Sequence, residues 1–344
     1  MAESLTDHIK RRAAVIAERV ELELTVAGTE YAPLERAVFK STKNNTKVPK
    51  EKHVITLQRA IADGEYCKTA LKMLARRLKE VGQERITSGS LAAGIKTLAV
   101  WHRCLNSGDK TFLNLCSKYI SLIEPPASNA LGQMYGAYLR EMLTAFAKLK
   151  HAYHRDTMFD DNHVSKLGQI EVVEAVPHML KQMKMLLQCD LQGGLIDSKT
   201  RSSVQYAINL LVLDTVGLFQ AIDAAMDRVR DFIGRLRPED AQRMASMYET
   251  FSKMPDKVLL MLRQASLDGE VAIPVTAFDS RTLKEFKRRV EEVQSKLKTE
   301  VGSYETVKAL ADVAEYTGGE TPYGDDDDHV PAPTFTLEEL DNSG

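Results

Sequence analysis

The sequence predicts an all-α protein of about ten helices, either a right-handed stack (a solenoid) or a bundle that runs into such a stack. Apolar residues recur every three or four positions over most of the chain, as one helix face requires. The one β-like stretch, Val271–Phe278, contains Pro274 and is predicted to be a loop. Glycine, proline and asparagine divide the chain into helix-length segments with short connections. At 344 residues and 44% apolar, the chain can bury a large core.

The predicted helices follow these breaks in order. One is expected to begin at Pro49, because proline is favoured at the first helical position, and to bury Val54, Leu57 and Ile61. Pro177 predicts a kink or a helix start. The same spacing predicts further helices at residues 71–81, 134–149, 172–187 and 204–230, the last of which is apolar nearly all round and should be the most buried.

The cysteines and the apolar runs indicate a soluble, cytosolic protein. The cysteines have no metal-site or disulfide spacing and should be small apolar core residues. The first residues lack the apolar core of a signal peptide. The most apolar segment, 207–226, is interrupted by polar and acidic residues, so no charge-free run reaches the roughly 18 residues of a membrane span. The cysteines are Cys67, Cys104, Cys116 and Cys189.

The net charge of −2 conceals two segments of opposite sign. From residue 305 onward there are eleven acidic residues and one lysine, a net charge of −10, which leaves +8 on the preceding 304 residues. The last part, from about Thr317, is rich in Gly, Pro and Asp and is expected to be a disordered acidic tail. The folded part is therefore basic, and an anionic partner is compatible with it.

The densest basic segment, Arg36–Lys52, has a net charge of +5 over 17 residues. Within it, Lys50, Lys52 and His53 fall in the predicted first helical turn, where the helix dipole disfavours cations by up to ~1 kcal/mol each. A compact, multiply charged anion would compensate, and a phosphorylated inositol headgroup fits lysine point charges. Nucleic acid fits less well, because no aromatic residue is interleaved between Lys40 and Lys52 for stacking and arginine is scarce there. The alternative is a solvated lysine-rich surface.

Lys40, nine further residues, and then Lys50-x-Lys52-His53 resemble the phosphoinositide-binding signature of ANTH domains, found in phosphatidylinositol-binding clathrin assembly proteins. The resemblance covers about residues 4–300 in one order. It includes SLTDHI near the N-terminus and segments 96–112, 134–156 and 174–187. It implies an ENTH/ANTH-like solenoid whose Lys40, Lys50, Lys52 and His53 bind the phosphates of phosphatidylinositol 4,5-bisphosphate. Lys43 and Lys47 lie between them and are secondary candidates from charge alone.

The resemblance also implies an endocytic adaptor on the cytoplasmic membrane face, in clathrin-coated pits and vesicles, that binds clathrin, an adaptor complex and a vesicle SNARE. The expected organisation is an N-terminal helix and linker (1–30), the ANTH domain (31–300), a terminal helix (301–316) and the acidic tail (317–344). The first helix has Leu5, Ile9, Ile16 and Val20 on one face, which inserts into the bilayer or packs on the solenoid.

Three further patterns have competing interpretations. Leu337–Asp341 resembles a clathrin-binding box with Glu338 at an apolar position, and a plain acidic tail is the simpler interpretation. Met254, Val258 and Met261 fall in the SNARE-binding stretch of the resemblance, but their helical spacing favours core positions. The competing hypothesis for the whole chain is a helical protein–protein scaffold whose basic patch binds an acidic partner.

No enzymatic function is predicted, because the sequence shows no Gly-rich phosphate loop, nucleophile elbow or recognisable carboxylate pair. No cofactor is expected. The histidines His151, His154 and His163 are interpreted as solvated helix-surface residues rather than metal ligands. His102, beside Trp101, is predicted to be a packed helix residue.

Overall fold

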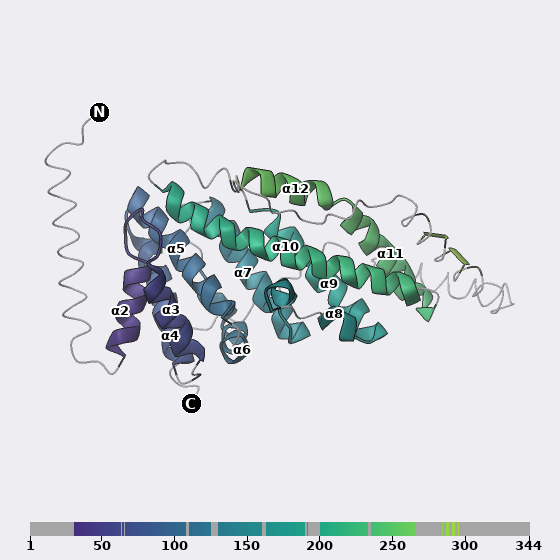
Figure 1. Cartoon of the computed structure of the whole chain (residues 1–344), viewed down its shortest axis with the longest axis horizontal. Helices are drawn as coiled ribbons and strands as arrows, with labels where there is room; N and C mark the ends of the chain where they lie inside the picture. The colour runs from purple at the N-terminus through teal and green to yellow at the C-terminus, as the bar shows by residue number, and fades with distance from the viewer. Residues whose placement is uncertain are drawn as a thin grey trace, which may run out of the picture. The chain divides into compact units, whose positions relative to one another are not determined.

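A computed structural model describes residues 31–62, 64, 66–107, 110–124, 130–159, 163–189, 191, 200–232, 235–265 and six single positions from 284 to 295. All regular structure within these residues is helical, so the all-α prediction is confirmed (Figure 1). The α-helices are α2 (Ala32–Ser41), α3 (Glu51–Ala62), α4 (Cys67–Gln83), α5 (Ser88–Leu105), α6 (Lys110–Lys118), α7 (Ala130–Leu149), α8 (His163–Lys166), α9 (Gln169–Leu186), α10 (Arg201–Phe232), α11 (Pro238–Ser252) and α12 (Pro255–Gln264). Two short 3₁₀ helices are η1 (Ile120–Leu122) and η2 (Tyr153–Phe159).

The described residues fall into two compact units. The first unit comprises residues 31–143 and 200–210, and the second comprises residues 144–191 and those from 211 onward. The predicted N-terminal helix, the loop at 271–278, the terminal helix and the acidic tail lie outside the described residues, so these expectations stay predictions.

In the first unit, α2 packs on α3, α4 packs on α5, and α2 and α3 also contact α4 and α5 (Figure 1). The helical spacing explains this core, because Leu57, Ile61, Leu71 and Leu74 are fully buried where the pattern placed them. The start of α3 is therefore supported by the packed helices α2, α3, α4 and α5.

The helix α5 lies at the centre of the first unit. All but four of its 18 residues are buried, and it contacts α2, α3, α4 and α6. Thr87 and Ser90 form a capping box at its start, which satisfies the first free N–H groups. His102 is fully buried, with Nδ1 2.8 Å from the hydroxyl of Tyr135, so its interpretation as a packed residue is confirmed.

The long helix α10 is less completely buried than α5, so the prediction that residues 204–230 form the most buried helix is wrong. Leu213, for example, is 50% exposed. The apolar composition of this segment overestimated its burial, because the sequence alone does not distinguish an exposed leucine from a buried one. By length and mean hydropathy (1.4) α10 could cross a membrane, but 67% of its apolar window is buried inside the fold, as in a core helix.

In the second unit, α9 packs against α11, and the Phe219 and Phe251 rings lie 5.0 Å apart in its core. Pro177 lies in the middle of α9, so the alternative that a helix starts near it is wrong. Val172 and Val176 are fully buried before the proline, and this packing sustains helix on both sides of it. The four cysteines are all within the described residues and are buried thiols, as predicted.

Candidate anion-binding site

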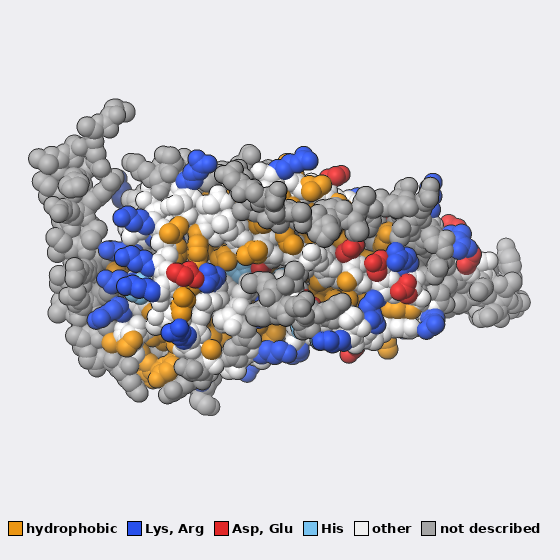
Figure 2. All heavy atoms as spheres, viewed as in Figure 1, with side chains coloured by type: hydrophobic (Ala, Val, Ile, Leu, Met, Phe, Trp, Pro, Cys, Tyr) orange, Lys and Arg blue, Asp and Glu red, His pale blue; other side chains and the backbone are white. Residues whose placement is uncertain are grey.

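A pocket of about 310 Å³ lies where the end of α2, the loop 42–50 and the start of α3 meet. Six of its ten described lining residues are lysines, and none of these ten is acidic. Figure 2 shows Lys and Arg side chains gathered at the left of the view, over the helices of the first unit. The lining residues are Lys40, Ser41, Lys43, Asn45, Lys47, Val48, Lys50, Lys52, His53 and Lys96.

All six basic residues singled out from the sequence line this one pocket. Lys40 lies in the last turn of α2, and Lys43 and Lys47 lie in the loop. Lys50 and Lys52 are exposed, at and just before the start of α3. The sequence reasoning missed Lys96, which belongs to α5 and lies 53 residues from Lys43.

The helix α3 begins at Glu51, two residues later than predicted from Pro49. Lys50 therefore precedes the helix, and its carbonyl accepts a hydrogen bond from His53 N–H at 2.9 Å. Lys52 and His53 are in the first turn, as predicted. The first N–H groups of a helix have no carbonyl partner within that helix, so this end remains suited to an anion.

The pKa of His53 is lowered from its ordinary value of 6.5, first because partial burial penalises the charged ring. The positive charges of Lys52, Lys40 and Lys50 lower it further. With its pKa below 6.5, His53 is mainly neutral at pH 7 and can donate one hydrogen bond to a phosphate oxygen.

Glu51, the only acid of the basic segment, is held by an arginine from α5. Arg103 Nη2 lies 2.5 Å from Glu51 Oε1, and Arg103 Nη1 donates to the hydroxyl of Tyr206 at 3.2 Å. Glu51 is absent from the ten described residues that line the pocket. This ion pair offsets the negative charge of Glu51, whose carboxylate lies outside the described lining of the pocket.

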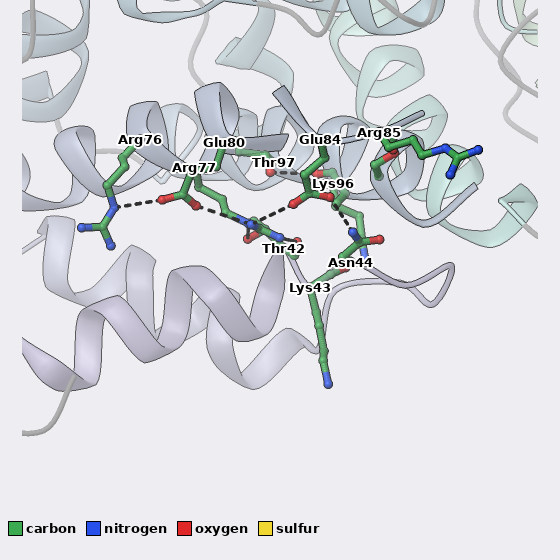
Figure 3. Close-up of polar contacts among 12 residues, drawn as sticks. Thr42, Lys43, Asn44, Arg76, Arg77, Glu80, Glu84, Arg85, Lys96 and Thr97 are labelled. Atoms are coloured by element: carbon green, nitrogen blue, oxygen red, sulfur yellow. Dashed lines mark hydrogen bonds and ion pairs between the residues drawn. The ribbon is translucent and has the colours of Figure 1, made fainter. Parts of the chain in front are cut away.

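Arg77, a buried residue of α4, anchors the beginning of the loop. Its guanidinium donates to the carbonyl of Thr42 at 3.2 Å and to the hydroxyl of the same residue at 3.3 Å. It also lies 3.5 Å from Glu80 and 3.7 Å from Glu84, which compensate its charge (Figure 3). Glu84 in turn accepts a 2.5 Å hydrogen bond from Asn44.

Lys96 anchors the middle of the loop, and Ser202 and Ser203 of α10 anchor its end. The ammonium of Lys96 donates to the carbonyl of Lys43 and, at 2.7 Å, to that of Asn45. Ser203 Oγ donates to the carbonyls of Thr46 at 2.9 Å and Lys47 at 3.1 Å. The loop carbonyls thus point into the protein, whereas Lys43 in Figure 3 points away from the network. Of these anchors, only Lys96 gave a signal in the sequence, as the one charged residue between Leu91 and Trp101.

One of the three histidines predicted to lie on the solvated helix surface differs from that prediction. His154 is buried, and its Nδ1 lies 3.3 Å from the amide of Gln182, so the solvated-surface interpretation is wrong for it. The periodicity could not show that η2 folds back onto the second unit. The rings of His151 and His163 stack with centroids 3.8 Å apart, and His151 lies 2.5 Å from Asp156. The described residues contain no group of three or more side chains arranged to hold a metal ion.

Met254, Val258 and Met261 are all buried, which agrees with their interpretation as core residues. The hydroxyl of Thr215 lies 3.5 Å from the sulfur of Met261, within the second unit. These side chains do not form an exposed helix-binding groove by themselves.

The lysine-lined pocket at the start of α3 combines positive charge with the N–H groups of a helix end, an arrangement that suits an anion. Residues 33–266 match the model of the ANTH domain, and the chain belongs to this family. The family is one of non-enzymatic adaptors, as predicted.

Three relatives cover 70% of the chain. An ENTH domain-containing protein of Schizosaccharomyces pombe is 27% identical over 254 residues, which are 37% of that protein. Two Arabidopsis thaliana proteins, each named "Putative clathrin assembly protein", are 23% and 22% identical, over 45% and 44% of their lengths. The chain therefore spans less than half the length of these relatives.

Proposed function

We propose that this chain is a phosphoinositide-binding endocytic adaptor that docks on the cytoplasmic face of membranes through the lysine-lined pocket. The observation that carries the proposal is the convergence of six lysines and a neutral histidine on a pocket whose ten described lining residues include no acid. Carried over from the family signature, Lys40, Lys50, Lys52 and His53 hold the headgroup phosphates, with Lys43 and Lys47 as secondary contacts.

The chemistry of the pocket favours phosphatidylinositol 4,5-bisphosphate over a nucleic acid. Lysine ammoniums are point charges that suit clustered monoester phosphates, whereas planar recognition favours arginine. No aromatic side chain and no arginine occur among the ten described lining residues, so a base would find no stacking surface there. A volume of about 310 Å³ suits a single small headgroup.

We further propose that the adaptor links the membrane to clathrin coat assembly in coated pits and vesicles. The names of the Arabidopsis thaliana relatives and the ANTH family support this link. The proposed organisation keeps the ANTH domain at 31–300, the first helix in 1–30, a terminal helix in 301–316 and the acidic tail in 317–344. Clathrin binding through Leu337–Asp341 and vesicle SNARE binding belong to the same proposal, and the burial of Met254, Val258 and Met261 gives SNARE binding no added support.

Vesicle sedimentation tests the lipid proposal. The full chain is mixed with phosphatidylcholine vesicles that contain phosphatidylinositol 4,5-bisphosphate, unphosphorylated phosphatidylinositol or phosphatidylserine at matched surface charge. We expect most of the protein to pellet only with the bisphosphate vesicles. Equal pelleting at equal surface charge would contradict a headgroup site. No pelleting, together with salt-sensitive capture of an acidic protein, would favour the protein-scaffold alternative.

The contribution of His53 to binding should grow as the pH falls from about 7.5 to about 5.5. A bound phosphate raises the lowered pKa of His53, so binding takes up a proton, and each unit of increase is worth up to about tenfold in affinity. Phosphate monoesters themselves gain protons near pH 6, which acts in the opposite direction. The measurement is therefore the ratio of wild-type to His53→Gln affinity at each pH.

A ratio that stays constant across the pH range would contradict this role of His53.

The stability of the folded protein should depend on pH in the opposite sense, so that the contribution of His53 to stability falls as the pH falls. Because the folded-state pKa lies below 6.5, the unfolded chain binds the proton more readily, and this contribution lowers stability as the pH falls below about 6.5. Thermal unfolding of the two proteins without ligand checks this sign.

A further inference from the structure

Lys96 is an unusual residue for the centre of a packed unit. It is 1% exposed and lies in the middle of α5, between Ile95 and Thr97, both of which are also buried. A buried ammonium is costly unless oxygen acceptors replace its water. Its position and its partners therefore need a reason beyond core packing.

Three acceptors of Lys96 come from one short piece of chain, residues 43–45. Nζ donates to the carbonyl of Lys43, to the carbonyl of Asn45 at 2.7 Å and to Oδ1 of Asn45 at 3.2 Å. An ammonium has three hydrogens, and these three neutral oxygens can take all of them. Lys96 thus lines the pocket with its donors already directed at the loop rather than at a ligand.

The same contacts fix the backbone that carries the pocket lysines. Asn45 Oδ1 also accepts a hydrogen bond from the N–H of Lys47 at 3.0 Å. Lys96 therefore bonds directly to Lys43 and Asn45 and reaches Lys47 through the Asn45 side chain. With the carbonyls of Lys43 and Asn45 turned inward, the Lys43 side chain extends away from the network (Figure 3). Ordering a loop before binding removes that entropic cost from the binding step.

We propose that Lys96 is a positioning residue of the pocket, whose buried ammonium holds the loop 42–50 so that its lysines converge on the anion. The proposal rests on the proposed headgroup-binding function, and it adds a residue that the binding signature does not contain. Lys96 acts through the loop backbone, and its positive charge beneath the pocket adds to the field that the anion meets.

The test compares Lys96→Met with Lys79→Met, which removes an exposed lysine of α4 outside the pocket lining. The probe is soluble inositol 1,4,5-trisphosphate, titrated by calorimetry. We expect Lys96→Met to weaken binding by about tenfold or more, since hydrogen bonds to a buried charge are lost, and Lys79→Met to change it by less than about twofold. Lys96→Arg keeps the charge and should recover part of the loss.

Amide hydrogen exchange of the ligand-free proteins separates positioning from direct contact. In Lys96→Met the amide of Lys47, which donates to Asn45, should exchange about tenfold faster, while the amides of α4 keep wild-type protection. Weaker binding with unchanged loop exchange would overturn the positioning role, and unchanged binding would overturn it as well. Val81→Ala, in the core of α4, controls for general destabilisation and should leave affinity unchanged.

Two further outcomes are distinguishable. If Lys96→Met does not fold, Lys96→Gln, which keeps a shorter amide donor, takes its place in both measurements with the same expected direction. If the wild-type chain does not bind the trisphosphate or the bisphosphate vesicles, the proposed function fails and the pocket role of Lys96 fails with it. Wild-type binding with an unaffected Lys96→Met variant removes only the role of Lys96.

Discussion

Replacing Lys50 and Lys52 together with glutamate should abolish sedimentation with phosphatidylinositol 4,5-bisphosphate vesicles. Both side chains are exposed and line the pocket. Each change from lysine to glutamate lowers the charge by two, so the double change lowers the net charge of the pocket lining by four. Two glutamates would repel the phosphates and lose two charge-assisted contacts. We expect an affinity loss of at least about 100-fold, which corresponds to about 2.7 kcal/mol.

This double variant should keep its fold, which makes the loss interpretable. Lys50 and Lys52 lie at the N-terminal end of α3, where the helix dipole favours acidic residues. The variant should therefore melt at the wild-type temperature or slightly above it. A cation at this position is unfavourable for the isolated helix, and its presence is consistent with selection for an anion rather than for stability.

The matched control is Lys110→Glu with Lys118→Glu. These lysines are the exposed first and last residues of α6, outside the pocket lining, and the change in net charge is the same. The control should sediment like the wild type except for a small loss from long-range attraction. If both double variants lost binding equally, binding would depend on net charge and the pocket assignment would be wrong.

The basic pocket was predictable in part because its main residues are close in sequence. Lys40, Lys50 and His53 lie at the end of one helix and the start of the next, so charge and helix signals alone place them together. The anchors of the loop were not predictable in this way. Arg77 is 35 residues from Thr42 and Ser203 is 157 residues from Thr46, and no local pattern encodes such pairings.

The same limit applies to the fold. Helical spacing identified α4, α7 and α9 because each buries one face regardless of its neighbours. It misjudged His154, whose burial depends on the packing of η2 against a distant helix rather than on its own segment. Periodicity shows which face of a helix is apolar, whereas tertiary contacts determine which polar residues are buried.

Gly217 of α10 marks that packing of η2. A Cβ atom built on Gly217 would lie 2.2 Å from the carbonyl oxygen of His154 and 3.0 Å from its carbonyl carbon. Both distances involve backbone atoms, which cannot rotate away as a side-chain end can. His154 and Arg155 are buried in this region, so moving η2 would also disturb buried polar groups.

We therefore expect Gly217→Ala to destabilise the protein by about 3 kcal/mol, and Gly217→Val by more. Alanine is intrinsically better than glycine in a helix interior by up to ~1 kcal/mol, but the backbone overlap outweighs this preference. Thermal or urea unfolding that reports on the second unit measures the effect. Wild-type stability of Gly217→Ala would show that η2 can move away from α10 at little cost.

Gly82→Ala, in the first unit, should have the opposite sign when the unfolding of the first unit is followed. Gly82 lies in the last turn of α4, and a Cβ atom there would have no heavy atom within 4 Å. Without overlap, only the helix preference and the reduced freedom of the unfolded chain remain, so stability should rise by about 0.5–1 kcal/mol. Two identical substitutions in two helices would then differ by about 4 kcal/mol, and the difference measures how closely η2 approaches α10. If Gly217→Ala and Gly82→Ala lowered the free energy of unfolding by the same amount, helix propensity and the close approach of η2 to α10 would not explain the two effects.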